Sequence, residues 1–258
     1  MTMLGGSVAA NAVTITSGTG AEGTARNCTP GVTSCDTISP VLFNTFGGNP
    51  GDASSSASQS PPDYGTSTAS VTLTSLLGEA AFHDQVVGAP GTREAANGNA
   101  LQSYTYMGST PTTMTFSEVL TYSQIVTGLA APSGQGVGAL IDVFSLPPGA
   151  LFDAGVSSAD NDIALFSPSE QIGYVDIASA VYADSNTNAG TTQTLSVTVG
   201  LAPGETIWIL DTLQAIAANG GMVEASMAPA SVPEPATLSL FGLGLAAAAV
   251  IRRRRNRN

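Results

Sequence analysis

The sequence predicts an all-β protein, an antiparallel β-sandwich or jelly roll of about ten strands, followed by one C-terminal transmembrane helix. Three observations predict this class. Threonine and valine favour strands and are abundant, while 29 glycines and 15 prolines break the chain at short intervals. Several segments alternate polar and apolar residues with the period of a half-buried strand. Before residue 236 no segment has the period of an amphipathic helix.

In the first half of the chain, strands are expected at 13–16, 38–43, 70–76, 101–107 and 114–126, and the last of these could form one strand or two. The segment 17–37 is rich in Gly, Thr, Ser and Asn, and the segment 47–65 is dense in Gly, Pro, Ser and Asp. Because these residue types favour turns, both segments are expected to be loops.

In the second half, strands are expected at 137–144, 172–177, 195–199, 206–210 and 222–227, with turns at 186–190 and 203–204. The segment 211–218 could be one turn of helix or a continuation of the preceding strand. A strand is favoured, because the hairpin signal Asn219-Gly220-Gly221 follows directly.

Three parts of the chain are expected: residues 1–12 as the remnant of a signal peptide, 13–230 as an exported β-sandwich domain, and 231–258 as a C-terminal tail. The Ala10-x-Ala12 pattern is typical of signal-peptide cleavage, but the residues before it carry no charge and only a short apolar stretch. The alternative for this segment is an ordinary flexible N-terminus.

Acidic residues greatly outnumber basic residues in the chain. There is no lysine, and only Arg26 and Arg93 oppose the 18 acidic residues that precede Pro233, so this part carries a net charge of about −16. Binding to a phosphate backbone depends on Lys and Arg, so nucleic acid is excluded as a partner. Self-repulsion of the acidic residues favours solubility.

The tail has three parts in a fixed order. Pro233-Glu234-Pro235 is followed by an uncharged stretch from Ala236 to Ile251 and then by a cluster of arginines. The sixteen residues of the stretch would make a helix of roughly 24 Å, shorter than a bilayer core of about 30 Å, and snorkelling arginines could close the gap. Positive charge stays on the cytoplasmic side, which places the residues before Pro233 outside the cytoplasm. A buried core helix is the alternative.

These three parts resemble the PEP-CTERM sorting signal of Gram-negative bacteria that make exopolysaccharide, over residues 232–258 only. The resemblance implies recognition by an exosortase, a transient stay in the inner membrane, and release to the cell surface or the extracellular matrix. It assigns the recognition site to Pro233, Glu234 and Pro235, and the membrane span to the stretch that includes Ala236, Leu240, Leu245 and Ile251. The basic stop is Arg252, Arg253, Arg254, Arg255 and Arg257.

Two further sites are expected in loops. Cys28 and Cys35 are the only cysteines, and in an exported chain they are expected to form a disulfide, with free thiols as the alternative. Asp153, Asp160 and Asp162 are candidate ligands of a calcium ion, the one cofactor that the sequence raises. The alternative is that these aspartates are ordinary turn residues.

No catalytic set is found, so the chain is not expected to be an enzyme. The only histidine, His83, lies beside Asp84, but no Gly-x-Ser-x-Gly nucleophile motif accompanies them. The first hypothesis is a non-enzymatic protein of the cell surface or of the biofilm matrix. The second is a carbohydrate-binding module for the matrix exopolysaccharide, with Tyr104 and Tyr106 as candidate contacts, and the third is a secreted hydrolase.

Overall fold

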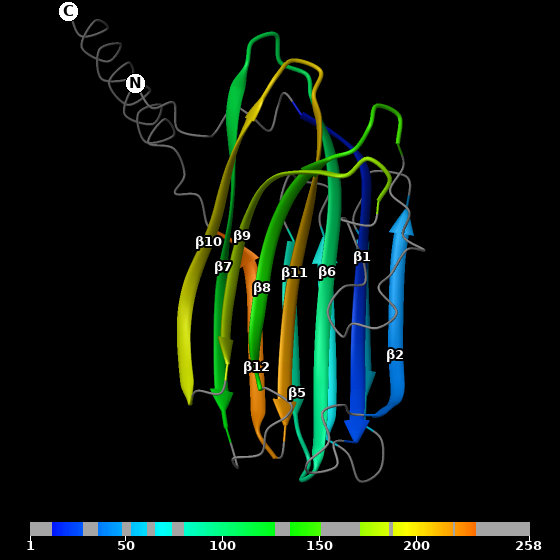
Figure 1. Cartoon of the computed structure of the whole chain (residues 1–258), viewed down its shortest axis with the longest axis vertical. Coiled ribbons are helices and arrows are strands. Elements are labelled where there is room, and N and C mark those ends of the chain that lie inside the picture. The colour runs from blue at the N-terminus through cyan, green and yellow to red at the C-terminus, as the bar shows by residue number, and fades with distance from the viewer. Residues whose placement is uncertain are drawn as a thin grey trace, which may run out of the picture.

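The computed structural model describes residues 12–27, 36–47, 53–60, 65–73, 80–126, 135–150, 171–185, 188–218 and 220–230. These residues form twelve strands, which run along the long axis of the molecule (Figure 1). The first six are β1 (Ala12–Asn27), β2 (Asp36–Gly47), β3 (Ala53–Gln59), β4 (Thr66–Leu73), β5 (Ala80–Val87) and β6 (Thr92–Tyr106). The last six are β7 (Thr112–Ile125), β8 (Gly136–Ser145), β9 (Val175–Ser185), β10 (Ala189–Leu201), β11 (Thr206–Ala218) and β12 (Met222–Pro229).

The strands form two six-stranded antiparallel sheets. Sheet A has the order β2-β1-β6-β11-β8-β9, and sheet B has the order β10-β7-β12-β5-β4-β3. The two sheets enclose one hydrophobic core, so the prediction of an all-β antiparallel sandwich is confirmed.

The eight strands from β5 to β12 cross repeatedly between the sheets. They contribute β6-β11-β8-β9 to sheet A and β5-β12-β7-β10 to sheet B, which is the strand order of a jelly roll. The hairpin of β1 and β2 extends sheet A beside β6, and β4 and β3 extend sheet B beside β5. β11 and β12, although late in the chain, therefore lie inside their sheets.

Parts of the two segments expected to be loops form strands. β1 covers most of 17–37 and pairs with β6 from Ala12 to Asn27, and β3 lies within 47–65. Their inward positions carry small residues, so the apolar alternation that predicts a strand is missing. Thr19 of β1 and Ser55 of β3 face each other across the interior with their hydroxyl oxygens 2.9 Å apart. Pairing with neighbouring strands, rather than local propensity, forms these two strands.

Other expectations are closer to the structure. The segment 114–126 is one strand, β7, and 211–218 continues as part of β11. Gly220 has a φ of 84°, as the predicted hairpin turn before β12 requires. The expected strand at 172–177 is displaced, because residues 172–173 form a turn and β9 runs from Val175 to Ser185.

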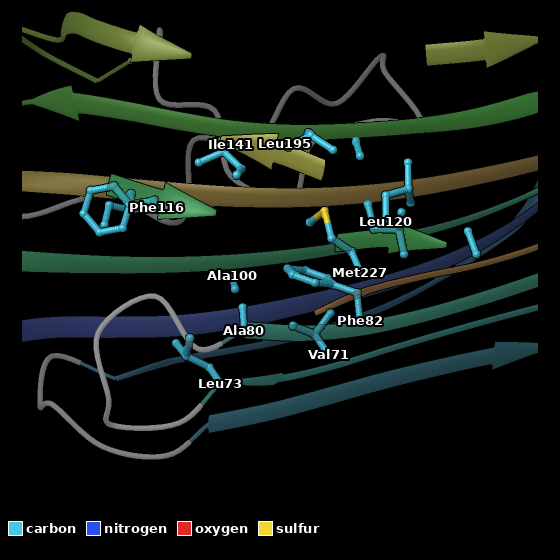
Figure 2. Packing of buried hydrophobic residues seen from close by; sticks show 14 of the residues in the cluster. Val71, Leu73, Ala80, Phe82, Ala100, Phe116, Leu120, Ile141, Leu195 and Met227 are labelled. Atoms are coloured by element: carbon cyan, nitrogen blue, oxygen red, sulfur yellow. The ribbon is translucent and has the colours of Figure 1, made fainter. Parts of the chain in front are cut away.

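The main core fills the space between the sheets. Phe82 of β5 pairs with Met227 of β12, and Leu120 of β7 also pairs with Met227. Figure 2 shows these side chains with Val71 and Leu73 of β4 in the same cluster. All five are buried. This packing fixes which face of each strand points inward, because side chains alternate along a strand.

A second, smaller cluster lies on the other face of sheet A. It consists of Leu101, Phe144, Trp208 and Leu210, and the rings of Phe144 and Trp208 stack with centroids 6.3 Å apart. In β11 the odd-numbered residues face the main core, so Trp208 and Leu210 face away from it. Trp208 is buried, with 3% of its surface exposed.

The predicted transmembrane helix, residues 236–251, lies outside the described residues. Within the described part of the chain, no helix is long and apolar enough to cross a membrane.

Candidate functional site

Several predicted site residues fall outside the described part of the chain. These are the recognition residues Pro233, Glu234 and Pro235, the span residues, the tail arginines, the cysteines Cys28 and Cys35, and the aspartates Asp153, Asp160 and Asp162. Their roles stay predictions. Asn27 and Asp36, the residues next to the cysteines, are Cα partners in the β1–β2 ladder.

His83 and Asp84 do not form a pair. They are consecutive residues of β5, so their side chains point to opposite faces of sheet B. His83 is exposed on the outer face, whereas Asp84 is fully buried in the interior. This geometry removes the His83–Asp84 dyad on which the hydrolase hypothesis relied.

Tyr104 and Tyr106 are core residues rather than an exposed binding platform. Both point inward from β6, with 2% and 5% of their surfaces exposed. The Tyr104 hydroxyl donates to Oε1 of Gln102, and the Tyr106 hydroxyl donates to the backbone oxygen of Thr110 at 2.9 Å. Neither ring can stack on a sugar without opening the sandwich.

The unexpected feature of the interior is a set of four buried carboxyl groups, one on each of four strands. They are Asp84 of β5, Glu94 of β6, Glu118 of β7 and Asp211 of β11, with 0%, 0%, 2% and 4% of their surfaces exposed. Burial in an apolar interior disfavours the charged form and raises the pKa of all four.

These carboxyl groups have few partners. Both carboxylate oxygens of Asp84 and both of Glu118 lack a hydrogen bond. Burial raises the pKa of Glu94, and hydrogen bonds from the Thr92 side chain and from the backbone nitrogen of Gly65, the latter at 3.1 Å, oppose this rise, while Oε2 has no hydrogen bond. An unpaired buried charge costs several kcal/mol, so burial favours the protonated form of Asp84 and Glu118.

No basic group described in the structure faces this interior. His83 points outward, and Arg93 lies on the opposite face of β6 from Glu94. Within the described residues no group of three or more His, Cys, Asp or Glu side chains could hold a metal ion. In the described part of the chain the interior acids therefore have no side-chain cation as a partner.

A hydrogen-bonded cluster links the two sheets at the β9–β10 side of the sandwich. The hydroxyl of Tyr122, in β7 of sheet B, donates to Oδ2 of Asp184 at 2.5 Å and lies 2.7 Å from the hydroxyl of Tyr182. Tyr182 and Asp184 belong to β9 of sheet A. Burial, then the hydrogen bond to Asp184, raises the pKa of Tyr122, so its hydroxyl stays protonated and remains a donor.

A fifth carboxyl group, Asp142 of β8, lies beside the second cluster. Its Oδ2 accepts a hydrogen bond from the Tyr174 hydroxyl at 3.3 Å. Burial, and then the charge of Asp176, raises the pKa of Asp142 to about 6, while the Tyr174 hydrogen bond lowers it.

Reasoning from the sequence treated the acids as surface residues and missed the interior set. A signal was present for three of the four, because each of those three occupies an inward position in an alternating strand. Asp84 lies between Phe82 and Val86, Glu118 between Phe116 and Leu120, and Asp211 between Ile209 and Leu213, always two residues away.

Comparison with known proteins identifies the tail. The PEP-CTERM protein-sorting motif matches residues 231–255, so the chain carries this motif at the place expected. The motif implies export, sorting to the cell surface and processing by an exosortase.

No curated protein matches the chain. One solved structure, described as "Structural basis for the promiscuous specificity of the carbohydrate-binding modules from the beta-sandwich super family", aligns with 84% of this chain and 84% of its own. The identity is 10% and the TM-score is 0.22, so this similarity supports no conclusion about fold or ligand.

Proposed function

We propose that this chain is a non-enzymatic protein of the cell surface or of the exopolysaccharide matrix of a Gram-negative bacterium, delivered by an exosortase that acts on its tail. The observation that carries the proposal is the PEP-CTERM motif at 231–255. In this function residues 236–251 hold the protein transiently in the inner membrane, and the sandwich lies outside the cytoplasm.

The body of the protein agrees with a structural role. The only histidine is separated from its neighbouring acid by the sheet, and the buried acids have no access to a substrate. The outer face of sheet B is lined by hydroxyl groups, as in the neighbouring pairs Thr115–Thr198 and Ser117–Ser196, whose oxygens lie 2.8 Å apart. Exposed hydroxyl groups hydrogen-bond to water, so this face is hydrated without charged side chains.

Fractionation and intact mass of the protein in its own host test the sorting role. We expect a product in the surface or matrix fraction whose C-terminus lies near Pro233. Glu234→Ala should leave the full-length chain in the inner membrane. Glu224→Ala, which removes an exposed glutamate of β12, should be processed normally. Full-length wild-type protein in the cytosol would contradict the proposal.

Carbohydrate binding is the second candidate, and it now needs a surface other than the one expected. The outer face of sheet B carries exposed hydroxyl groups, among them those of Thr115 and Thr198, with oxygens 2.8 Å apart, and those of Thr121 and Thr192, with oxygens 3.3 Å apart. Thr115→Val and Thr121→Val would weaken retention of the protein on its host's exopolysaccharide if this face binds sugar. Unchanged retention of both folded variants would exclude it.

A further inference from the structure

The tail leaves the sandwich from the middle of sheet B rather than from one of its ends. β12 pairs with β7 as far as Pro229, opposite Glu118, and the backbone nitrogen of Ala230 then donates to the backbone oxygen of Ser117 at 2.8 Å. Because β7 begins at Thr112, its residues 112–116 extend past Ala230, and β12 ends partway along β7 (Figure 1).

The linker between the body and the proposed membrane span is short. The span starts at Ala236, six residues after Ala230, and an extended chain covers at most about 3.6 Å per residue, so the linker reaches roughly 20 Å. Residues 112–116 of β7 rise by about 3.4 Å each, so β7 extends roughly 17 Å past Ala230 and leads there into the β6–β7 turn. A bilayer across that end of the sandwich would need a straight, fully extended linker, whereas a bilayer alongside sheet B lies well within reach.

The side of sheet B that can meet a bilayer is its outer face, because its inner face closes the core. Although the chain has 19 acidic residues, His83 and Glu224 are the only titratable side chains among the outward residues that the structure describes on this sheet. Most of the others are Ser or Thr, among them the pairs Thr115–Thr198 and Ser117–Ser196. Since charged groups are costly to bring against lipid, this face can approach a bilayer at little cost.

An apolar patch lies on the same face, at the end of β12 opposite to the tail. Met222 of β12 pairs with Val87 of β5 on one side and with Ile125 of β7 on the other. All three residues occupy outward positions, and 37% of the surface of Val87 and 51% of that of Ile125 are exposed. Exposed apolar side chains are stabilised at the boundary between lipid headgroups and acyl chains, so the patch suits a bilayer surface.

We propose that, before the tail is removed, the outer face of sheet B lies against the bilayer that holds residues 236–251, with Val87, Met222 and Ile125 at the headgroup boundary. This orientation rests on the proposed membrane-held stage of sorting and defines how the body lies during that stage. The short linker holds the face at the lipid, and removal of the tail would free the face for the matrix.

The test uses the full-length chain in vesicles of phosphatidylethanolamine and phosphatidylglycerol whose acyl chains carry bromine, which quenches nearby tryptophan. Ile125→Trp places a reporter in the patch. Val181→Trp is the matched control, because Val181 is an apolar residue on the outer side of sheet A with 72% of its surface exposed. Trp208, the only tryptophan of the wild type, is buried and gives each variant the same background. We expect Ile125→Trp to lose most of its added emission on brominated vesicles and Val181→Trp to lose none.

Val87→Trp is a second reporter in the same patch, in case Ile125→Trp does not fold, and it should be quenched as strongly. If the variants float with the vesicles but neither patch reporter is quenched, the orientation is overturned and the membrane-held stage stands. Equal quenching of Val181→Trp would also overturn it, because the body would then have no preferred face. Failure of the full chain to float with the vesicles would contradict the membrane-held stage itself, and this orientation with it.

Discussion

The close approach of β6 to β4 and β5 at Gly98 allows a sharp test of the fold. Gly98 points into the core opposite Val71 and Phe82, which are cross-strand partners in sheet B. A Cβ atom at position 98 would lie 2.6 Å from Cγ2 of Val71 and 3.0 Å from Cδ1 of Phe82, so the Val71 methyl group would have to move by roughly 0.8 Å to reach ordinary contact at 3.4 Å. Valine is stiff at χ1, and the site is enclosed, so this movement is resisted.

We therefore expect Gly98→Ala to lower the free energy of unfolding by about 1–3 kcal/mol, the usual cost of overpacking. Gly138→Ala is the matched control, in β8 of the same sheet. Its Cβ atom would have as its nearest neighbour only Oε1 of Gln214, at 3.9 Å. Replacing a strand glycine without a clash should raise the free energy of unfolding by roughly 0.5–1 kcal/mol.

Urea unfolding of both variants, followed by Trp208 fluorescence, measures the difference. Trp208 reports on sheet A, and its burial makes its emission sensitive to unfolding. The reasoning is refuted if Gly98→Ala is as stable as wild type, or if the two substitutions change stability in the same direction and by the same amount. Either result would mean that the sheets are not in contact at Gly98.

Three further outcomes are expected. Tyr122→Phe removes the hydrogen bond to Asp184 that joins the two sheets. In urea unfolding at pH 7 the variant should have a free energy of unfolding lower by about 1–3 kcal/mol. An unchanged free energy of unfolding would show that this hydrogen bond does not stabilise the fold. The pKa of Asp142 is raised to about 6, so its contribution to the free energy of unfolding declines as the pH rises from about 4 to 6. Asp142→Asn should therefore make the urea concentration at the unfolding midpoint depend less on pH over this range. The same pH dependence in wild type and variant would contradict the raised pKa. Intact mass should show Cys28 and Cys35 oxidised, with the protein two hydrogens lighter than after reduction, and alkylation of the unreduced, denatured protein would rule this out.

Strands in which apolar and polar residues alternate strongly could be predicted from the sequence, whereas strands without this alternation could not. β7 and β11 carry apolar residues at nearly every second position, and the Asn219-Gly220-Gly221 signal placed the turn before β12. β3 and the part of β1 after residue 16 escaped prediction, because their inward residues are Gly, Ala, Ser and Thr, which also make loops. What makes them strands is the partner on either side, and no local pattern contains that information.

The candidate sites divide in the same way. The sorting tail could be found from the sequence, because its three parts are contiguous and their order alone identifies the motif. The interior carboxyl groups of Asp84, Glu94, Glu118 and Asp211 could not, because they are far apart in the chain and face one interior only through the crossing order of the strands. The alternation of a single strand indicates which of its residues point inward, but it does not show which other strands enclose the same core.

The position of β12 inside sheet B has a consequence for the timing of assembly. This strand is the last in the order of the chain, yet it lies between β7 and β5, so sheet B stays split until residues up to Pro229 are available for pairing. The sorting motif begins only two residues later, at 231. Folding of the body is thus a late event in biosynthesis, and it must compete in rate with whatever acts on the adjoining tail.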